Sequence, residues 1–315
     1  MKFIDSLKEG MRISEIYLCK SKQIAQTKTG KDYGNLVLQD KTGTIDSKIW
    51  DLNSPGIGNF ETLDYVCVDA EVTVFQGNNQ LNIRRIRKAD EGEYSPVDYL
   101  PVSTRNIETM YEDLVRYVRS LKNPYLSRLA SSYFIEDAEF AKAFRFHSAA
   151  KSIHHGFVGG LLEHTLSVVK MCDYYAGYYP GINRDLLLTA AMFHDVGKIK
   201  ELSVFPENDY TDDGQLLGHI IIGTEMITER IQTIAGFPKK LENELKHCIL
   251  SHHGELEYGS PKKPALLEAL ALSFADNTDA KMETMIEVLR GAGENQGWLG
   301  YNRLLETNIR KSTEG

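Results

Sequence analysis

Five histidines and two aspartates, spread over five separate segments, have the residue types and spacing of a metal site. They are His164, the pair His194-Asp195, His219, the pair His252-His253, and Asp276. Imidazole nitrogens and carboxylate oxygens form the ligand mixture that Mn²⁺, Fe²⁺ and Zn²⁺ accept. Because a bound divalent metal makes water nucleophilic at neutral pH, this set predicts a hydrolytic enzyme.

Other polar residues near this set are candidates for supporting roles. A metal-ligating histidine needs an acceptor for its second ring nitrogen, and Glu163 or Glu201 could supply one. His154 and His155 precede a glycine-rich stretch, where the backbone can approach a ligand closely, so both are candidate phosphate contacts. A helix-start loop with exposed histidines explains these two residues slightly better.

The segments that carry the candidate ligands have the apolar periodicity of helices. Apolar side chains there recur at spacings of three and four, as on the buried face of an amphipathic helix. Leu186–Phe193 is a nearly continuous apolar run that leads directly into His194, and Leu266–Phe274 leads to Asp276 in the same way. The sequence therefore predicts an all-α helical bundle over residues 104–292 that gathers the ligands by helix packing.

Residues 1–90 have a different pattern, that of short strands. Runs of strand-forming residues separated by turn residues are predicted at Ile13–Cys19, Tyr33–Gln39, Thr44–Trp50, Tyr65–Phe75 and Gln80–Arg87. Several short strands within about 80 residues favour a small all-β barrel, for which an OB-fold is the first candidate. Residues 91–103, with two prolines and three acidic residues, are predicted to be a linker, and residues 293–315 a polar C-terminal tail.

The composition is that of a multidomain globular protein rather than a membrane protein. Of 315 residues, 42% are hydrophobic, and no apolar run approaches the roughly 20 residues of a membrane helix. The net charge of −8 is uneven, because residues 1–90 carry 13 basic and 12 acidic residues and the remainder carries 23 and 32. The near-neutral part, with its basic clusters, suits contact with a phosphate backbone. Four widely spaced cysteines and the absence of a signal-peptide pattern predict a reduced, cytoplasmic protein.

The order of these residues resembles the metal-dependent HD phosphohydrolase superfamily, which has an all-helical fold. Residues 190–202, AAMFHDVGKIKEL, are similar to its central motif, and the further histidines resemble its two-metal subset. The resemblance implies a first metal held by His164, His194, Asp195 and Asp276. It implies a second metal held by bridging Asp195, His219, and either His252 or His253, with His252 favoured.

The same resemblance assigns catalytic roles to Asp195 and Lys198. Asp195 would join the two metals, and Lys198, three residues later, would lie near the substrate phosphate. A solvated lysine on a helix explains Lys198 about equally well. A metal-polarised water would attack phosphorus while the metals and Lys198 stabilise the charge on the phosphoryl oxygens.

Residues 33–50, YGNLVLQDKTGTIDSKIW, are similar to the strand–turn–strand core of nucleic-acid-binding OB-folds. Such folds stack bases on aromatic rings and follow the backbone with basic side chains. The candidate substrate contacts are Tyr33, Trp50, Lys28, Lys31, Lys48 and Arg84. A place in the barrel core is the better interpretation of Phe75, whereas for Trp50 core and surface are about equally supported.

An OB-fold followed by a two-metal HD domain resembles the YhaM-type 3′–5′ exoribonucleases of Gram-positive bacteria. The stretches GGLLEHTLSV (159–168) and SHHGELEYGSP (251–261) support this resemblance, which covers nearly the whole chain. It implies removal of nucleotides from the 3′ ends of single-stranded RNA, and of single-stranded DNA as a further substrate. It also implies a cofactor of two divalent ions, for which Mn²⁺ is the first candidate and Fe²⁺, Co²⁺ and Zn²⁺ are alternatives. The protein is further expected to form a homo-oligomer and not to bind membranes.

Two other functions remain open from the sequence. The first is an HD-type hydrolase of small nucleotides, such as cyclic dinucleotides, dNTPs or alarmones. Residues 257–261, EYGSP, match the GYP signature of the cyclic-di-GMP subset poorly, and an OB-fold has no role with a mononucleotide. The second is a non-enzymatic protein that binds single strands or replication sites, against which the full ligand set argues.

Overall fold

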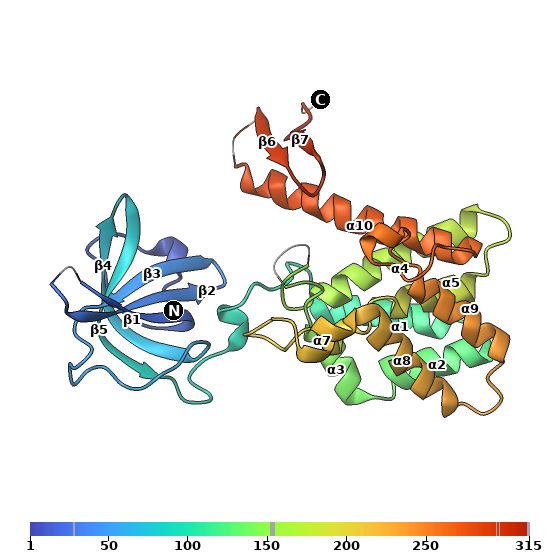
Figure 1. Cartoon of the computed structure of the whole chain (residues 1–315), viewed down its shortest axis with the longest axis horizontal. Coiled ribbons are helices and arrows are strands. Elements are labelled where there is room, and N and C mark those ends of the chain that lie inside the picture. Colours follow the sequence, from blue (N-terminus) through green and yellow to red (C-terminus); the bar gives the residue numbers. More distant parts are fainter. Residues whose placement is uncertain (28, 152–154, 294, 296, 314–315) are drawn as a thin grey trace. The chain divides into compact units, whose positions relative to one another are not determined.

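The chain, described here from a computed structural model, divides into two compact units, Met1–Val102 and Ser103–Gly315 (Figure 1). The structure describes residues 1–27, 29–151, 155–293, 295 and 297–313. Two predicted substrate contacts, Lys28 and His154, lie outside the described residues. None of the described helices combines the length and apolar composition needed to cross a bilayer.

The first unit is a closed five-stranded barrel with the strand order β1-β2-β3-β5-β4. β3 and β5 pair in parallel, and the other neighbouring strands pair antiparallel. This order is that of an OB-fold, and the predicted barrel is confirmed. The strands are β1 (Arg12–Gln26), β2 (Asp32–Asp40), β3 (Gly43–Ile49), β4 (Tyr65–Phe75) and β5 (Asn78–Lys88), with a short 3₁₀ helix, η1 (Ile4–Ser6), before them.

Strand β1 closes the barrel because it pairs with two partners. Its first half pairs with β4 and its second half with β2, and the register shifts between Cys19 and Ser21. Such a bulge bends a strand and increases its twist. Along β2, buried and partly exposed residues alternate, so that Leu36 and Leu38 fill the core while Tyr33 lies on the outer face.

The predicted linker packs against the barrel over most of its length. The Tyr94 ring stacks on Tyr65 with centroids 3.9 Å apart, and Tyr99 meets Tyr65 edge-on at 5.2 Å. The Gln39 side chain donates a hydrogen bond to the Tyr99 carbonyl at 3.0 Å. A 3₁₀ helix, η2 (Pro96–Asp98), lies within this segment, and the compact unit extends to Val102.

The second unit is helical, as predicted. Several helices begin at asparagine or aspartate residues whose side chains accept hydrogen bonds from first-turn amides, including Asn106, Asn123, Asp137 and Asn183. The helices are α1 (Ile107–Ser120), α2 (Pro124–Phe134), α3 (Ala138–Phe146), α4 (Gly160–Tyr178), α5 (Arg184–Phe193), α6 (Lys198–Glu201), α7 (Asp212–Leu216), α8 (Gly218–Gln232), α9 (Lys239–Leu250), η3 (Leu256–Tyr258) and α10 (Leu267–Gly291).

Helix α5 is the centre of this unit. All residues from Leu186 to Phe193 are buried, and the helix packs against α2, α4, α9 and α10. A helix that is apolar on every side is a buried helix, which explains the continuous apolar run in the sequence. Its C-terminal end delivers His194 into the interior.

A two-stranded hairpin follows α10 in the segment predicted as a polar tail. It consists of β6 (Trp298–Asn302) and β7 (Thr307–Arg310) (Figure 1). Ile309 of β7 is buried, and β7 contacts α10. The alternation of polar and apolar residues in five- and four-residue strands is too short to have distinguished this hairpin from an irregular tail.

Gly197 allows α6 and α8 to approach each other closely. A Cβ atom at Gly197 would lie 2.0 Å from the His219 carbonyl oxygen and 2.7 Å from the Gly223 nitrogen. Both neighbouring atoms belong to the backbone, so neither can rotate away. Because Gly197 has no side chain, the segment that carries His194 and Asp195 can lie this close to His219.

We expect Gly197→Ala to destabilise the helical unit by about 1–3 kcal/mol, because the added methyl group overlaps the α8 backbone. Gly177→Ala in α4 is the matched control, since no atom lies within 4 Å of its added Cβ. A helical Gly→Ala change of this kind stabilises by about 0.5–1 kcal/mol. Urea unfolding followed by far-ultraviolet circular dichroism measures both; equal stability of the two variants would contradict the close approach.

Candidate metal centre and active site

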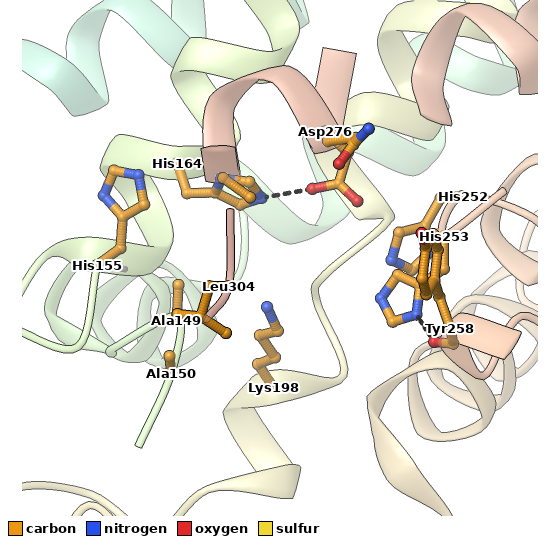
Figure 2. Close-up of a pocket in the computed structure, with 12 residues that line it drawn as sticks. Ala149, Ala150, His155, His164, Lys198, His252, His253, Tyr258, Asp276 and Leu304 are labelled. Atoms are coloured by element: carbon orange, nitrogen blue, oxygen red, sulfur yellow. Dashed lines mark hydrogen bonds and ion pairs between the residues drawn. The ribbon is translucent and has the colours of Figure 1, made fainter. Parts of the chain in front are cut away.

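The predicted metal ligands from five segments meet in the interior of the helical unit. They come from α4 (His164), the end of α5 (His194, Asp195), the start of α8 (His219), the loop after α9 (His252, His253) and the middle of α10 (Asp276). Figure 2 shows His164 and Asp276 facing one another, with His252 and His253 on the other side of Asp276. The side chains form two clusters.

The first cluster surrounds the Nε2 atom of His164. His194 Nε2 lies 3.1 Å from it, Asp276 Oδ1 3.2 Å, and Asp195 Oδ2 3.4 Å. His164, His194 and Asp276 each offer one ligand atom within 4.8 Å of the others. Two nitrogens and two carboxylate oxygens therefore converge on one small volume.

The second cluster consists of His219, His252 and His253, whose ligand atoms also lie within 4.8 Å of one another. Asp195 Oδ1 lies 3.4 Å from His219 Nε2 and 3.8 Å from His252 Nε2. The two oxygens of Asp195 thus face different clusters. The structure brings both His252 and His253 to this cluster, where the sequence had left the choice between them open.

Three buried atoms in the second cluster have no hydrogen-bond partner among the described residues: Asp195 Oδ1, His219 Nε2 and His252 Nε2. Buried polar atoms in folded proteins are nearly always paired. Their closeness to one another and their chemistry, two imidazole nitrogens and a carboxylate oxygen, fit a divalent metal.

Each clustered histidine uses its Nδ1 atom for an outward hydrogen bond, which leaves Nε2 for the centre. The acceptors are the carbonyls of Ala191 for His194 (2.8 Å), Ile249 for His252 (2.7 Å) and Tyr258 for His253 (2.9 Å). For the other two they are carboxylates, Glu201 for His219 (3.0 Å) and Asp279 for His164 (2.7 Å). Such partners fix the ring orientation and the tautomer.

Glu201 thus lies where a supporting acceptor was predicted, whereas Glu163 accepts a hydrogen bond from Ser103. Sequence reasoning missed Asp279. It follows Asp276 by three residues, so both carboxylates lie on one face of α10, and this spacing was the available signal.

Charges in the clusters favour ionised Asp195 and neutral His252. Burial acts to raise the pKa of Asp195, but Lys198 and His194 outweigh it and hold the pKa well below its usual value. Burial, with His194 nearby, holds the pKa of His252 well below its usual value. A carboxylate and a neutral imidazole are the forms that bind a metal.

His164 differs, because burial acts to lower its pKa while the hydrogen bonds to Asp276 and Asp279 raise it to about 10. These carboxylates therefore favour the imidazolium form of the ring, and since a metal is bound by the neutral ring, metal binding would release one proton.

Lys198 is not a solvated helix lysine. Its ammonium lies 2.6 Å from Asp195 Oδ2, and its side chain is largely buried. In Figure 2 it points from α6 into the pocket between His164 and Asp276. A fixed positive charge is therefore available beside the metal ligands.

The clusters form one side of a cavity of about 660 Å³, within the size range of ligand sites. The cavity is lined by His155, His164, Lys198, His252, His253, Tyr258, Asp276, Asn277, Ala149, Ala150, Ala280 and Leu304. The predicted phosphate contact His155 is almost fully buried in this wall. Its Nε2 atom lies 3.0 Å from Asp279 Oδ2, and its Nδ1 atom has no partner among the described residues.

On the barrel, three of the predicted contacts lie together. Trp50 stacks on Tyr33 with centroids 5.2 Å apart and planes inclined by 29°. The Lys48 ammonium lies 5.6 Å from the centre of the Tyr33 ring. Trp50 Nε1 donates to the side chain of Asn82, and Lys48 donates to that of Asn35. Tyr33, Lys48 and Trp50 therefore form one partly exposed cluster over β2, β3 and β5.

The remaining predicted contacts have acidic partners. Lys31 lies 3.9 Å from Asp51, and Arg84 lies 2.6 Å from Glu71. Phe75 was wrongly placed in the barrel core. It is 59% exposed, because the end of β4 extends beyond the closed part of the barrel.

Comparison with known proteins identifies relatives that match most of the chain. An HD domain family model matches residues 161–281. The chain is 36% identical over 283 residues to the 3′–5′ exoribonuclease YhaM of Bacillus velezensis, covering 89% of this chain and 88% of the relative. It is 36% identical over 281 residues to that of a Geobacillus species (89% and 86%), and 35% identical over 287 residues to that of Bacillus subtilis (89% and 88%).

Among solved structures, the second OB-fold domain of replication protein A from Methanococcus maripaludis matches 30% of this chain and 98% of that chain. The TM-score is 0.24 and the identity 16%, so the OB-fold assignment rests on the strand order of the barrel.

We expect Asp279→Asn to weaken Mn²⁺ binding by on the order of 10- to 100-fold, as is typical when the partner of a ligating histidine is lost. The amide cannot hold the His164 ring as the carboxylate does. Isothermal titration calorimetry measures the affinity. Glu283→Gln, on the same helix and paired with Arg290 at 3.4 Å, is the control and should bind like the wild type; equal affinity in Asp279→Asn would refute the role.

Proposed function

Since the chain belongs to the YhaM family of 3′–5′ exoribonucleases, we propose that it removes nucleotides stepwise from the 3′ end of single-stranded RNA. The observation that carries this proposal is the pair of histidine–aspartate clusters that share Asp195 beside a cavity of about 660 Å³. The reaction depends on a divalent metal, as the HD domain implies. The relatives favour neither a small-nucleotide hydrolase nor a non-enzymatic binding protein.

The proposed site holds two ions, of which Mn²⁺ is the first candidate. The first would be held by His164, His194, Asp276 and Asp195 Oδ2, and the second by His219, His252, His253 and Asp195 Oδ1. The mixture of nitrogen and oxygen ligands supports Mn²⁺, with Fe²⁺, Co²⁺ and Zn²⁺ as alternatives. Bound metal supplies Lewis-acid catalysis and lowers the pKa of water for attack on phosphorus.

The chain's own residues bind and orient the scissile phosphate. Lys198 places a positive charge at the cavity wall, where it can stabilise the negative charge that grows on the phosphoryl oxygens. Its salt bridge with Asp195 keeps the ammonium in place without substrate. The partnerless Nδ1 of His155 is the second proposed phosphate contact.

The barrel is proposed to hold the RNA strand upstream of the cleaved end. Bases would stack on the exposed Trp50–Tyr33 pair, and Lys48, Lys31 and Arg84 would meet phosphates. Because one chain carries both units, a bound strand raises the local concentration of its own 3′ end at the metal site. Stacking does not read the sugar, so single-stranded DNA is a further proposed substrate.

Assembly and location remain predictions from the sequence. A homo-oligomer would cover apolar side chains on one exposed face of α10, which include Leu267, Leu270 and Phe274. Light scattering of the purified protein would measure its mass. The cytoplasmic location rests on the cysteines, all four of which are free.

We expect 5′-labelled single-stranded RNA incubated with wild type and Mn²⁺ to give a ladder that shortens by single nucleotides. EDTA should abolish the ladder, and so should Asp195→Ala, because one carboxylate serves both clusters. Added Mn²⁺ should restore the EDTA-treated wild type but not the variant. Intact RNA with wild type in Mn²⁺ would contradict the proposed function, and random internal cleavage would contradict the 3′–5′ direction.

Trp50→Ala should weaken binding of long single-stranded RNA by about 1–3 kcal/mol, the typical contribution of one stacked base. Cleavage of a dinucleotide, which has no upstream strand for the barrel to hold, should not change. Val97→Ala is the control, because Val97 is 47% exposed like Trp50 but lies on η2. Filter binding and initial rates test this; equal losses on both substrates would contradict the tethering role of the barrel.

A further inference from the structure

Tyr258 is an unpaired aromatic side chain at the cavity. It is the last residue of η3, lines the cavity beside His253, and is 68% exposed. Within the described residues its ring makes no aromatic contact and its hydroxyl makes no hydrogen bond. In Figure 2 Tyr258 and His155 lie on opposite sides of the pocket. The mechanism above gives this ring no role.

The backbone of Tyr258, by contrast, is firmly held. Its carbonyl accepts the hydrogen bond from His253 Nδ1 at 2.9 Å, and its amide donates to the Glu255 carbonyl at 3.1 Å. Gly259 ends η3 with a φ of +83°, which favours glycine. The hydroxyl of buried Ser260 lies 2.8 Å from the Lys262 carbonyl oxygen and 3.1 Å from that of Leu250, and its single hydrogen is shared between them. The loop therefore holds the exposed Tyr258 ring on a fixed backbone, and this backbone is hydrogen-bonded to His253, a predicted metal ligand.

Outside the metal clusters, Asn277 is the side-chain amide of the described lining that could form hydrogen bonds to a base. Ala149, Ala150, Ala280 and Leu304 supply the apolar part of the lining. The charged and imidazole groups lie at the metal clusters, where the phosphate must bind. Among the described lining residues, Tyr258 is the aromatic side chain that is not a histidine. Stacking on an aromatic ring accepts any base, because every base has a π-face.

We propose that Tyr258 is a substrate-binding residue that stacks on one of the two nucleobases flanking the scissile phosphodiester. This inference rests on the proposed function and assigns the residue that contacts a nucleobase in the same active site. Because the Tyr258 carbonyl orients His253, the stacked base and the second cluster are positioned by one residue. The contact favours single-stranded RNA, whose bases are free to stack, over base-paired RNA.

The test compares Tyr258→Ala, Tyr258→Phe and Tyr178→Ala with the wild type on single-stranded RNA in Mn²⁺. Losing one stacked base should lower kcat/KM of Tyr258→Ala by on the order of 10- to 100-fold. Tyr258→Phe keeps the ring and should retain wild-type activity. Tyr178→Ala is the matched control, because Tyr178 is 63% exposed but ends α4 and does not line the cavity.

Abasic substrates identify the contact. RNA is prepared with an abasic residue at the 3′-terminal or at the penultimate position. At one of the two positions, wild type should lose about the factor that Tyr258→Ala loses on normal RNA, and Tyr258→Ala should lose nothing more. If the losses from the variant and from the missing base multiply at both positions, no stacking occurs and the inference is overturned.

Metal binding separates a stacking role from a structural one. The bond to His253 uses the backbone carbonyl, so calorimetry should show unchanged Mn²⁺ stoichiometry and affinity in Tyr258→Ala. Weaker Mn²⁺ binding in this variant would overturn the inference in favour of a structural role. If wild type degrades RNA and Tyr258→Ala equals it, only the inference fails; if wild type leaves RNA intact, the proposed function fails first.

Discussion

The carboxylate of Asp195 is the interaction on which the structure of the site depends. It is 2% exposed, and its two oxygens face different histidine clusters while Lys198 contacts one of them. A buried ionised carboxylate is unfavourable unless it is paired or coordinates a metal. Here the surrounding lysine and histidines keep it ionised, and four other segments must pack around this one side chain to do so.

His194 and His252 are oriented by the same kind of local hydrogen bond at the end of a helix. His194 follows α5 and His252 follows α9, and in each case Nδ1 donates to the carbonyl three residues earlier. Carbonyls at a helix C-terminus lack partners within the helix, so a histidine at this position satisfies one and is oriented by it. Nε2 then points away from the helix. The buried helix and the ligand are therefore one unit, which explains why apolar runs lead directly into the histidines.

The division of the chain into two compact units separates two physical tasks. Metal ligation needs buried, rigid, desolvated groups, and these lie in the helical unit. Holding a flexible strand needs exposed aromatic and basic side chains, and Tyr33, Lys48 and Trp50 provide these on the barrel. Tyr258 combines the two requirements locally, since its backbone is hydrogen-bonded to His253 of the metal site and its ring is exposed.

The sequence by itself determined the features that depend on local pattern. The five barrel strands, the helical unit and the His194-Asp195 motif follow from periodicity and spacing, which short-range physics controls. Only the tertiary structure showed that Asp279 holds His164 and that both His252 and His253 reach one cluster. It also placed Phe75 outside the core and joined Tyr258 to His253. These features depend on tertiary contacts between residues far apart in the sequence. The periodicity of a segment does not indicate which distant residues its side chains will contact.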